Sequence, residues 1–218
     1  MAIPDKMTYL AGLCDALSLR WPDNRAVNLV FHGHSVPAGY ACTPWIDTFN
    51  AYPHQVHKTL AQRFPFALIN VIVTAVGGED SVSGAARFGE ALRHGPDLIV
   101  LDYGLNDRRR GLESAERAWR SMIEAALREK IKLVLMTPSW DRDCAFENES
   151  SQTLGAHARL IRSLASEYEA ALGDSFSTFE RYVSAGGDLN DLLSHVNHPS
   201  PLGHSLIARE ICSWFPAR

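Results

Sequence analysis

Ser35 follows a short apolar run and is the first candidate for chemistry in this sequence. Gly33 permits a tight turn, and the small residues after the serine leave its hydroxyl uncrowded. A serine in such a turn can attack a carbonyl carbon if a base takes its proton. The stretch differs from the Gly-x-Ser-x-Gly elbow, because Pro37 occupies the place of the second glycine. A serine that only caps a helix would give the same local pattern.

A candidate base for this serine stands near the C-terminal end of the sequence. Pro199 and Pro201 hold the chain extended just after His198, which fixes the approach of its imidazole. Histidine can take the serine proton and return it to a leaving group, because its ordinary pKa lies near neutrality. Taken alone, the same histidine could equally be a surface residue or a satisfied core residue.

Two further stretches could stabilise the oxyanion that such an attack creates. The pair Gly77-Gly78 permits a positive φ and leaves a backbone N–H uncovered, and Asn106 carries a side-chain amide. Both kinds of N–H group can donate to a developing negative charge. Each stretch by itself could be an ordinary turn. The glycines do not form Gly-x-Gly-x-x-Gly, so no dinucleotide site is predicted.

The elements around these residues predict how they are brought together. Four short apolar runs rich in Val, Ile and Leu are typical of strands covered on both faces; they are residues 26–32, 67–74, 98–103 and 131–137. A shorter fifth strand is placed within 171–176. Helical patterns cover residues 7–17, 53–63, 83–94, 113–130, 153–172 and 201–215. Alternating strands and helices predict a three-layer α/β/α sandwich with a mainly parallel five-stranded sheet, and reactive groups gather at its carboxyl edge.

The order Ser, Gly, Asn, His at these positions resembles the SGNH hydrolases, also called GDSL esterases/lipases. The most specific match is Gly104-Leu105-Asn106-Asp107, which is similar to the Gly-x-Asn-Asp block of that family. The resemblance extends over residues 26–215 and implies a flavodoxin-like fold and hydrolysis of carboxylic esters without a metal or an organic cofactor. It also implies that Ser35 is the nucleophile and His198 the general base. The backbone N–H groups of Ser35 and Gly78 and the side chain of Asn106 would form the oxyanion hole.

Two positions depart from the pattern of this family. His34 stands before the nucleophile where Asp is usual, and His195 stands three residues before the base, again where Asp is usual. A neutral imidazole at position 195 supplies no negative charge to steady an imidazolium. Three explanations are open: His195 orients the base through its carbonyl or a ring nitrogen, a distant carboxylate (Asp191 or Asp141) serves, or the enzyme works as a Ser–His dyad. Of these, the backbone carbonyl of His195 is preferred.

The composition narrows the class of protein and the partners. The chain has 218 residues, and 21 basic against 25 acidic residues give a net charge of −4, which argues against a nucleic-acid binder. The run Arg108-Arg109-Arg110 is interpreted as a solvated loop in preference to an anion site. We expect one domain over residues 1–218, in which 1–25 form a helical extension. We expect no signal peptide, no membrane span and four reduced cysteines, and therefore a cytoplasmic location.

Two other functions compete with the esterase hypothesis. A metal-dependent hydrolase would draw on the many histidines, which are His32, His34, His195, His198 and His204. A non-catalytic binding module on the same fold is supported only by the missing acid.

The substrate is expected to be a small-molecule ester with a short acyl chain, such as an acetylated carbohydrate. Tyr40, Trp45, Tyr103 and Trp140 are candidates for its pocket, and residues 138–151 for a specificity loop. The oligomeric state does not follow from the sequence.

Overall fold

The centre of the molecule is a five-stranded sheet in which every neighbouring pair is parallel. The computed structural model describes residues 2–146 and 148–216 of the chain. The strands are β1 (Ala26–Gly33), β2 (Leu68–Val73), β3 (Leu98–Asp102), β4 (Lys132–Met136) and β5 (Ala171–Gly173), in the order β2-β1-β3-β4-β5. This is the strand order of flavodoxin-like folds. The predicted fold class is therefore confirmed.

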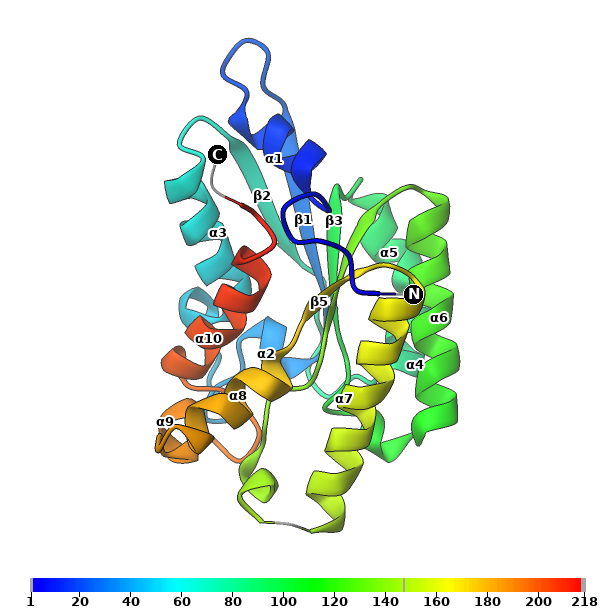
Figure 1. Cartoon of the computed structure of the whole chain (residues 1–218), viewed down its shortest axis with the longest axis vertical. Coiled ribbons are helices and arrows are strands. Elements are labelled where there is room, and N and C mark those ends of the chain that lie inside the picture. Colours follow the sequence, from blue (N-terminus) through cyan, green and yellow to red (C-terminus); the bar gives the residue numbers. More distant parts are fainter. Residues whose placement is uncertain (1, 147, 217–218) are drawn as a thin grey trace.

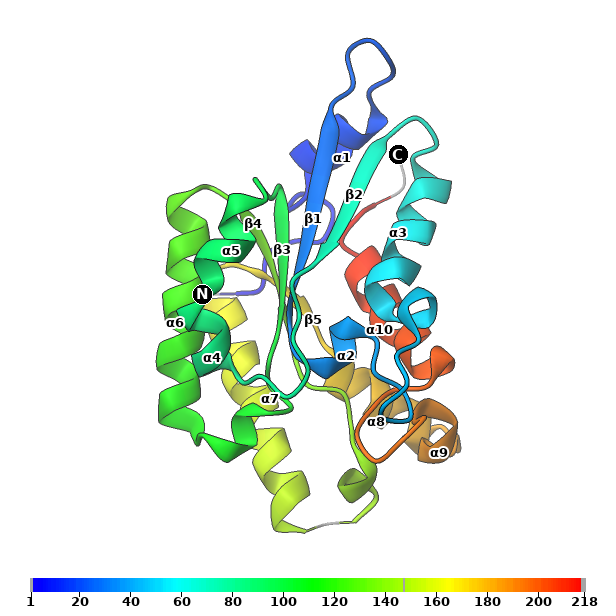
Figure 2. The same ribbon diagram turned by 180° about the vertical axis from the view of Figure 1, so that it is seen from behind.

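Helices cover both faces of this sheet (Figures 1 and 2). One face carries α1 (Ala11–Ser18), α3 (Tyr52–Arg63), α8 (Ser175–Ser184) and α10 (Pro201–Cys212), and the other carries α4 (Ser81–Ala86), α5 (Phe88–Arg93), α6 (Leu112–Arg128) and α7 (Glu149–Glu167). The one-turn helices α2 (Ser35–Ala38) and α9 (Leu189–Leu192) and the 3-10 turns η1 (Thr48–Asn50), η2 (Asp107–Arg109) and η3 (Arg142–Ala145) lie in the connections. The described part of the chain contains no helix that is both long and apolar enough to cross a membrane.

Alternation along the central strands divides the core into two layers. In β3, Leu98 and Val100 pack with the α1, α3 and α10 side, whereas Ile99 and Leu101 pack with the α5, α6 and α7 side. Successive side chains of a strand point to opposite faces, so a strand buried on both faces must be apolar at every position. The edge strand β2 is an exception to the prediction that all four runs are covered on both faces. Leu68 is 58% exposed and Asn70 is exposed, whereas Ile69, Val71 and Val73 pack against the core on the other face, so this edge strand is well covered on one face only.

Several predicted boundaries are wrong for identifiable reasons. The fifth strand ends at Gly173, and Ser175 already begins α8, because the Asp174 side chain accepts a hydrogen bond from the Ser177 N–H and starts a helix. The predicted helix 83–94 is two helices, α4 and α5, that meet at Arg87. The helix predicted over 153–172 begins earlier and ends earlier, since Asn148 and Ser151 form a capping box at its start.

Candidate active site

Ser35 lies at the carboxyl end of β1, in the first turn of α2, and only 6% of it is exposed. The turn is fixed by close approach of two neighbouring strands. A Cβ at Gly33 would lie 2.5 Å from the carbonyl oxygen of Asp102, so only glycine fits between β1 and β3 at this point. The Gly33 carbonyl also accepts a hydrogen bond from the Val76 N–H at 3.0 Å, which ties the end of β1 to the connection after β2.

His198 reaches Ser35 from a tight loop before α10. The Leu193–Pro199 bridge and the bond from Ser194 N–H to the His198 carbonyl (2.9 Å) close this loop. The Nε2 atom of His198 lies 3.0 Å from Ser35 Oγ, which is hydrogen-bond distance. The structure therefore brings together the two residues predicted as nucleophile and base, although 163 positions separate them in the sequence.

The other ring nitrogen of His198, Nδ1, lies 2.9 Å from the backbone carbonyl oxygen of Ala41. A carbonyl oxygen can only accept, so Nδ1 must carry the hydrogen, and Nε2 is then free to accept the proton of Ser35. The Ala41 carbonyl thus fixes the tautomer that a triad carboxylate would otherwise fix. Sequence reasoning missed Ala41, because every residue offers a backbone carbonyl and its side chain gives no signal.

None of the groups predicted to orient His198 bonds its Nδ1, so those predictions are corrected. The backbone N–H of His195 points to the His198 carbonyl (3.4 Å), while its ring stacks on the His198 ring with centroids 6.2 Å apart. The Asp191 carboxylate accepts a hydrogen bond from the Tyr182 hydroxyl at 3.1 Å. Asp141 is buried and forms an ion pair with Arg108 at 2.7 Å. Each of these three residues therefore has other contacts. The group that bonds Nδ1 is a backbone carbonyl, as predicted, but it belongs to Ala41 and not to His195.

Burial lowers the pKa of the His198 imidazole below its ordinary value, because the charged form loses water. The bond to the Ala41 carbonyl acts in the opposite direction, and the nearby rings of His34 and His195 lower the pKa of His198 further. A base with a lowered pKa stays neutral, and therefore able to accept a proton, to more acidic pH.

The predicted oxyanion donors lie at the carboxyl ends of three adjacent strands. Gly78 has a φ of +82°, which turns its backbone in a way that favours glycine. Within the described residues, the N–H groups of Ser35 and Gly78 have no hydrogen-bond acceptor. One N–H of the Asn106 amide donates to the Glu79 carbonyl at 2.7 Å, and an amide has a second N–H to offer.

The buried carboxylate of Asp107 holds the segments that carry these donors in place. Asp107 is fully buried, and its two oxygens accept hydrogen bonds from the Ser81 N–H (2.7 Å) and the Trp119 indole (2.8 Å). Burial raises its pKa, and these two bonds act against that rise. Asp107 therefore ties the segment after β3 to the start of α4 and to α6.

His34 lies in a second buried network, under the nucleophile turn. Its Nδ1 accepts a hydrogen bond from the Val36 N–H, and its Nε2 lies 3.4 Å from Asp102 Oδ1. The other Asp102 oxygen accepts a bond from the Tyr52 hydroxyl at 3.1 Å. The histidine that replaces the usual Asp thus caps α2 from its N-cap position.

The histidines of the metal hypothesis do not converge. His32 bonds Thr74 Oγ1 (2.9 Å) and the Gly84 carbonyl (3.1 Å) on the α4 side of the sheet, whereas His204 accepts a bond from the Tyr52 N–H on the α3 side. Burial lowers their pKa values to about 4 for His32 and about 3 for His204. Among the described residues, no group of three or more His, Cys, Asp or Glu side chains could hold a metal ion.

The predicted pocket aromatics occupy different surroundings. Tyr103 is fully buried, and Trp45 is 65% exposed. The Tyr40 ring lies between Gly77 and the His198 ring, with a centroid distance of 5.9 Å to the latter. Of these aromatic residues, Tyr40 therefore lies beside the proposed base.

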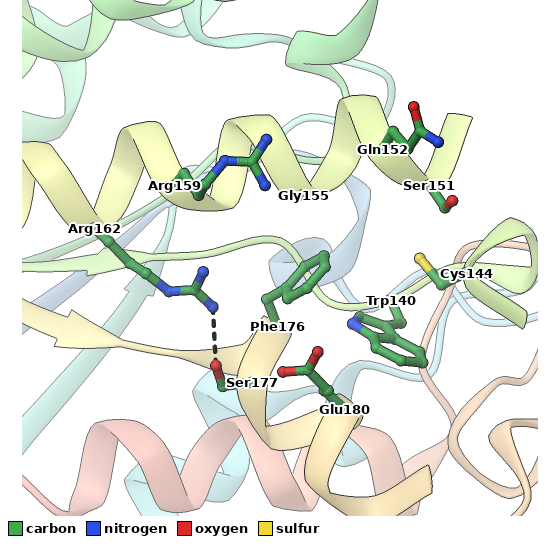
Figure 3. Close-up of a pocket in the computed structure, with 10 residues that line it drawn as sticks. All are labelled: Trp140, Cys144, Ser151, Gln152, Gly155, Arg159, Arg162, Phe176, Ser177 and Glu180. Atoms are coloured by element: carbon green, nitrogen blue, oxygen red, sulfur yellow. Dashed lines mark hydrogen bonds between the residues drawn. The ribbon is translucent and has the colours of Figure 1, made fainter. Parts of the chain in front are cut away.

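Trp140 lines a cavity of about 590 Å³ between η3, α7 and α8 (Figure 3). Its indole meets the Phe176 ring edge to face, and Arg159, Gln152 and Glu180 surround them. None of the residues proposed for chemistry lines this cavity. The loop predicted to set specificity, residues 138–151, contributes to its wall; Glu147 lies outside the described residues.

The run of three arginines divides into three environments. Arg108 is paired with Asp141 and donates to Ser150 Oγ at 2.9 Å. Arg110 is paired with Asp80 at 2.6 Å, and Arg109 is exposed. The interpretation as a solvated loop therefore fails for Arg108, whose side chain is only 20% exposed.

Comparison with known proteins supports the same reading of the fold. The sequence pattern of the GDSL-like lipase/acylhydrolase family matches residues 31–206. No curated protein sequence matches the chain. Among solved structures, Axe2, an acetylxylan esterase from Geobacillus stearothermophilus, superimposes with a TM-score of 0.74 at 21% identity, over 88% of this chain and 97% of that one. LAE5, an alpha/beta hydrolase from the metagenome of Lake Arreo in Spain, gives 0.73 at 19% identity, over 87% and 94%.

The chain belongs to the GDSL-like lipase/acylhydrolase family, because the matched span covers most of its length and includes Ser35, Gly78, Asn106 and His198. It is a serine ester hydrolase of the SGNH type. Neither a metal-dependent hydrolase nor a non-catalytic binding module is favoured.

Proposed function

We propose that Ser35 and His198 carry out the ester hydrolysis, with the Ala41 carbonyl in place of the usual triad carboxylate. The observation that carries this proposal is the continuous chain from Ser35 Oγ through the imidazole to the Ala41 carbonyl, with steps of 3.0 and 2.9 Å. Three solved structures of Axe2 are described as catalytic mutants, at a serine, a histidine and an aspartate. In this chain a backbone carbonyl would take over the orienting part of that aspartate's role.

In the first half of the reaction, Ser35 Oγ attacks the ester carbonyl carbon while His198 Nε2 takes the hydroxyl proton. The carbonyl oxygen becomes an oxyanion and accepts hydrogen bonds from the N–H groups of Ser35 and Gly78 and from the Asn106 amide. When the tetrahedral species collapses, the bond to the alcohol breaks, and His198 gives its proton to the leaving oxygen. The product is an acyl-Ser35 ester and a free alcohol.

In the second half, water replaces the alcohol. His198 takes a proton from the water as its oxygen attacks the acyl carbon, and the same three donors hold the oxyanion. Collapse releases the carboxylic acid and returns the proton to Ser35. The Ala41 carbonyl keeps the Nδ1 hydrogen in place throughout, but it supplies no full negative charge to the imidazolium.

We further propose that the substrate is a short-chain, acetyl-type ester of a carbohydrate. Axe2 is described as an acetylxylan esterase, and a variant of it as an acetyl-xylooligosaccharide esterase. None of the residues proposed for chemistry lines the cavity of Trp140 and Phe176, so it would hold a part of the substrate other than the reacting ester. It combines aromatic rings with arginine, glutamine and glutamate side chains (Figure 3). Sugars bind such sites by stacking their apolar face on a ring and bonding their hydroxyl groups to planar polar side chains.

The nucleophile is tested with p-nitrophenyl acetate after dialysis against a chelator. We expect the wild-type protein to retain activity, and Ser35→Ala to lose it almost completely. The exposed Ser163→Ala in α7 is the matched control and should behave as the wild type does. An organophosphate should label Ser35, which peptide mass spectrometry would locate. Full activity in Ser35→Ala would show that the assignment is wrong.

The acyl preference is tested on a series of p-nitrophenyl esters from acetate to palmitate. We expect kcat/KM to be highest for the shortest acyl groups. A steady rise toward palmitate would contradict the short-chain proposal while leaving the nucleophile assignment intact.

We also keep two earlier expectations as proposals. The chain would form one domain with a helical extension over residues 1–25, and it would work in the cytoplasm. The second rests on Cys42, Cys144 and Cys212, which are thiols here and suit a reducing compartment. Cell fractionation with an antibody to the protein checks the location.

A further inference from the structure

A second hollow, of about 460 Å³, adjoins the proposed oxyanion hole. Gly78, Arg109 and Arg110 are among the residues that line it. It differs from the cavity in Figure 3, which shares none of these residues. A group bound in this hollow would lie beside the N–H that Gly78 is proposed to offer to the reacting carbonyl.

The acidic side chains of this hollow are already neutralised. The Glu79 carboxylate pairs with Arg87, at 2.7 Å between Oε1 and Nε. One Asp80 oxygen pairs with Arg110 at 2.6 Å, and the other caps α4 by accepting the Ser83 N–H at 3.0 Å. Neither carboxylate is therefore free to compensate a further positive charge.

Arg109 supplies that further charge. Arg109 lines the hollow and is exposed, and its side chain has no ion pair or hydrogen bond to any described residue. Its backbone is nevertheless fixed, because the Arg109 N–H donates to the Asn106 carbonyl at 3.2 Å in η2. Arg109 is thus anchored through its backbone one turn after Asn106, a proposed oxyanion donor, and it lines the hollow together with Gly78, another proposed donor.

We propose that this hollow is an anion subsite, in which Arg109 binds a carboxylate on the ester substrate. The guanidinium offers paired N–H donors that match the two oxygens of a carboxylate. The subsite would favour esters of acidic molecules, such as an acylated sugar that bears a carboxylate. This inference rests on the proposed function, because it assumes that the reacting ester lies between Ser35 and the Gly78 and Asn106 donors.

The test compares two esters that differ only in charge, 3-acetoxybenzoate and 3-acetoxybenzamide. For the wild type and for Arg109→Gln, kcat/KM is measured for both at low ionic strength. We expect kcat/KM for the carboxylate ester, divided by kcat/KM for the amide ester, to fall about three- to fivefold in Arg109→Gln. A change of this size corresponds to the loss of one exposed ion pair. This fall should shrink at 0.5 M salt, since the charges are exposed.

A second arm places the carboxylate on the acyl side, with p-nitrophenyl hydrogen adipate against its methyl ester. If the kcat/KM ratio of charged to neutral ester falls in only one of the two arms, that arm shows whether the hollow binds the alcohol side or the acyl side of the ester. The matched control is Arg93→Gln, an exposed arginine of α5 in a different hollow near Gly95 and Pro96, at the opposite edge of the sheet. It changes the net charge equally and should leave both ratios unchanged.

Unchanged ratios for Arg109→Gln in both arms would overturn the subsite. An equal fall for Arg93→Gln would also overturn it, because the effect would then come from net charge alone. Failure of the proposed function looks different: neither the charged nor the neutral esters would be cleaved in a way that depends on Ser35.

Discussion

The two halves of the active site are built from different kinds of interaction. On the oxyanion side, Asp107 bonds two buried N–H groups, and the ion pairs of Glu79 and Asp80 hold the segment that contains Gly78. On the base side, His198 is held by a neutral carbonyl, a stacked histidine and a loop closed by backbone bonds. Full charges brace the donors, whereas backbone dipoles orient the base.

This difference separates two roles that one carboxylate usually combines. A triad carboxylate fixes the tautomer of the histidine and also stabilises its positive form. In this protein the Ala41 carbonyl can do the first, and among the described residues no carboxylate bonds the His198 ring to do the second. The site would therefore depend most on its oxyanion donors and on the geometry of His198, and less on the electrostatics around the imidazole. Four substitutions, taken from the largest expected effect to the smallest, test this comparison.

Removal of the base should have the largest effect. We expect His198→Ala to lower kcat by about 10⁴–10⁶-fold, because it removes the nitrogen that lies within hydrogen-bond distance of Ser35 Oγ. The measurement is p-nitrophenyl acetate hydrolysis at saturating substrate. The exposed His94→Ala serves as the matched control. A loss below tenfold would mean that His198 is not the base.

Asn106→Ala should come next, with a loss of about 10²–10³ in kcat and little change in KM. The amide is proposed to bond the oxygen strongly only when it carries negative charge. The same assay measures the loss, and unchanged thermal unfolding would show that the fold is intact. A rise in KM alone would assign Asn106 to ground-state binding instead.

Asp107→Asn should act indirectly and therefore less. An amide can accept only through its one oxygen, so either Ser81 N–H or the Trp119 indole would lose its partner, at a cost of about 1–3 kcal/mol in the free energy of unfolding. We expect kcat to fall about tenfold as the donors loosen. Urea unfolding and steady-state kinetics check both effects, with the exposed Asp23→Asn as control. Normal stability and activity would show that the brace is dispensable.

His195→Asp should have the smallest effect on rate but a clear effect on pH dependence. Burial lowers the pKa of His198, so the acid limb of kcat/KM in the wild type should lie below about 6.5. A carboxylate beside the ring favours the protonated form and should move that limb upward by about one pH unit. The kcat on the plateau should change only a few-fold. An unmoved limb, or a lower one, would mean that position 195 does not act on His198.

The sequence predicted the strands of this molecule better than the ends of its elements. The four apolar runs match β1 to β4 closely, and for the central strands the reason is that a parallel strand buried on both faces must be apolar at each position. The capping residues Asp174 and Asn148 overrode the apolar periodicity around them and shifted the ends of β5 and α7. Side-chain to backbone hydrogen bonds of this kind compete with the apolar periodicity in setting where an element begins or ends. Which of the two prevails depends on the contacts of the segment in the folded chain.

Local patterns thus determined the order of strands and helices, the family, and the positions of Ser35, Gly78, Asn106 and His198 at the ends of strands or before the last helix. These properties are written in burial periodicity and turn chemistry, which act over a few neighbouring residues. Only the tertiary structure decided that Ala41 meets His198 across 157 positions, that Arg108 pairs with Asp141, and that Arg109 has no ion pair with another described residue. Every residue has the same backbone carbonyl, and an ion pair depends on which segments lie side by side in the folded chain. Neither can therefore be predicted from the local sequence.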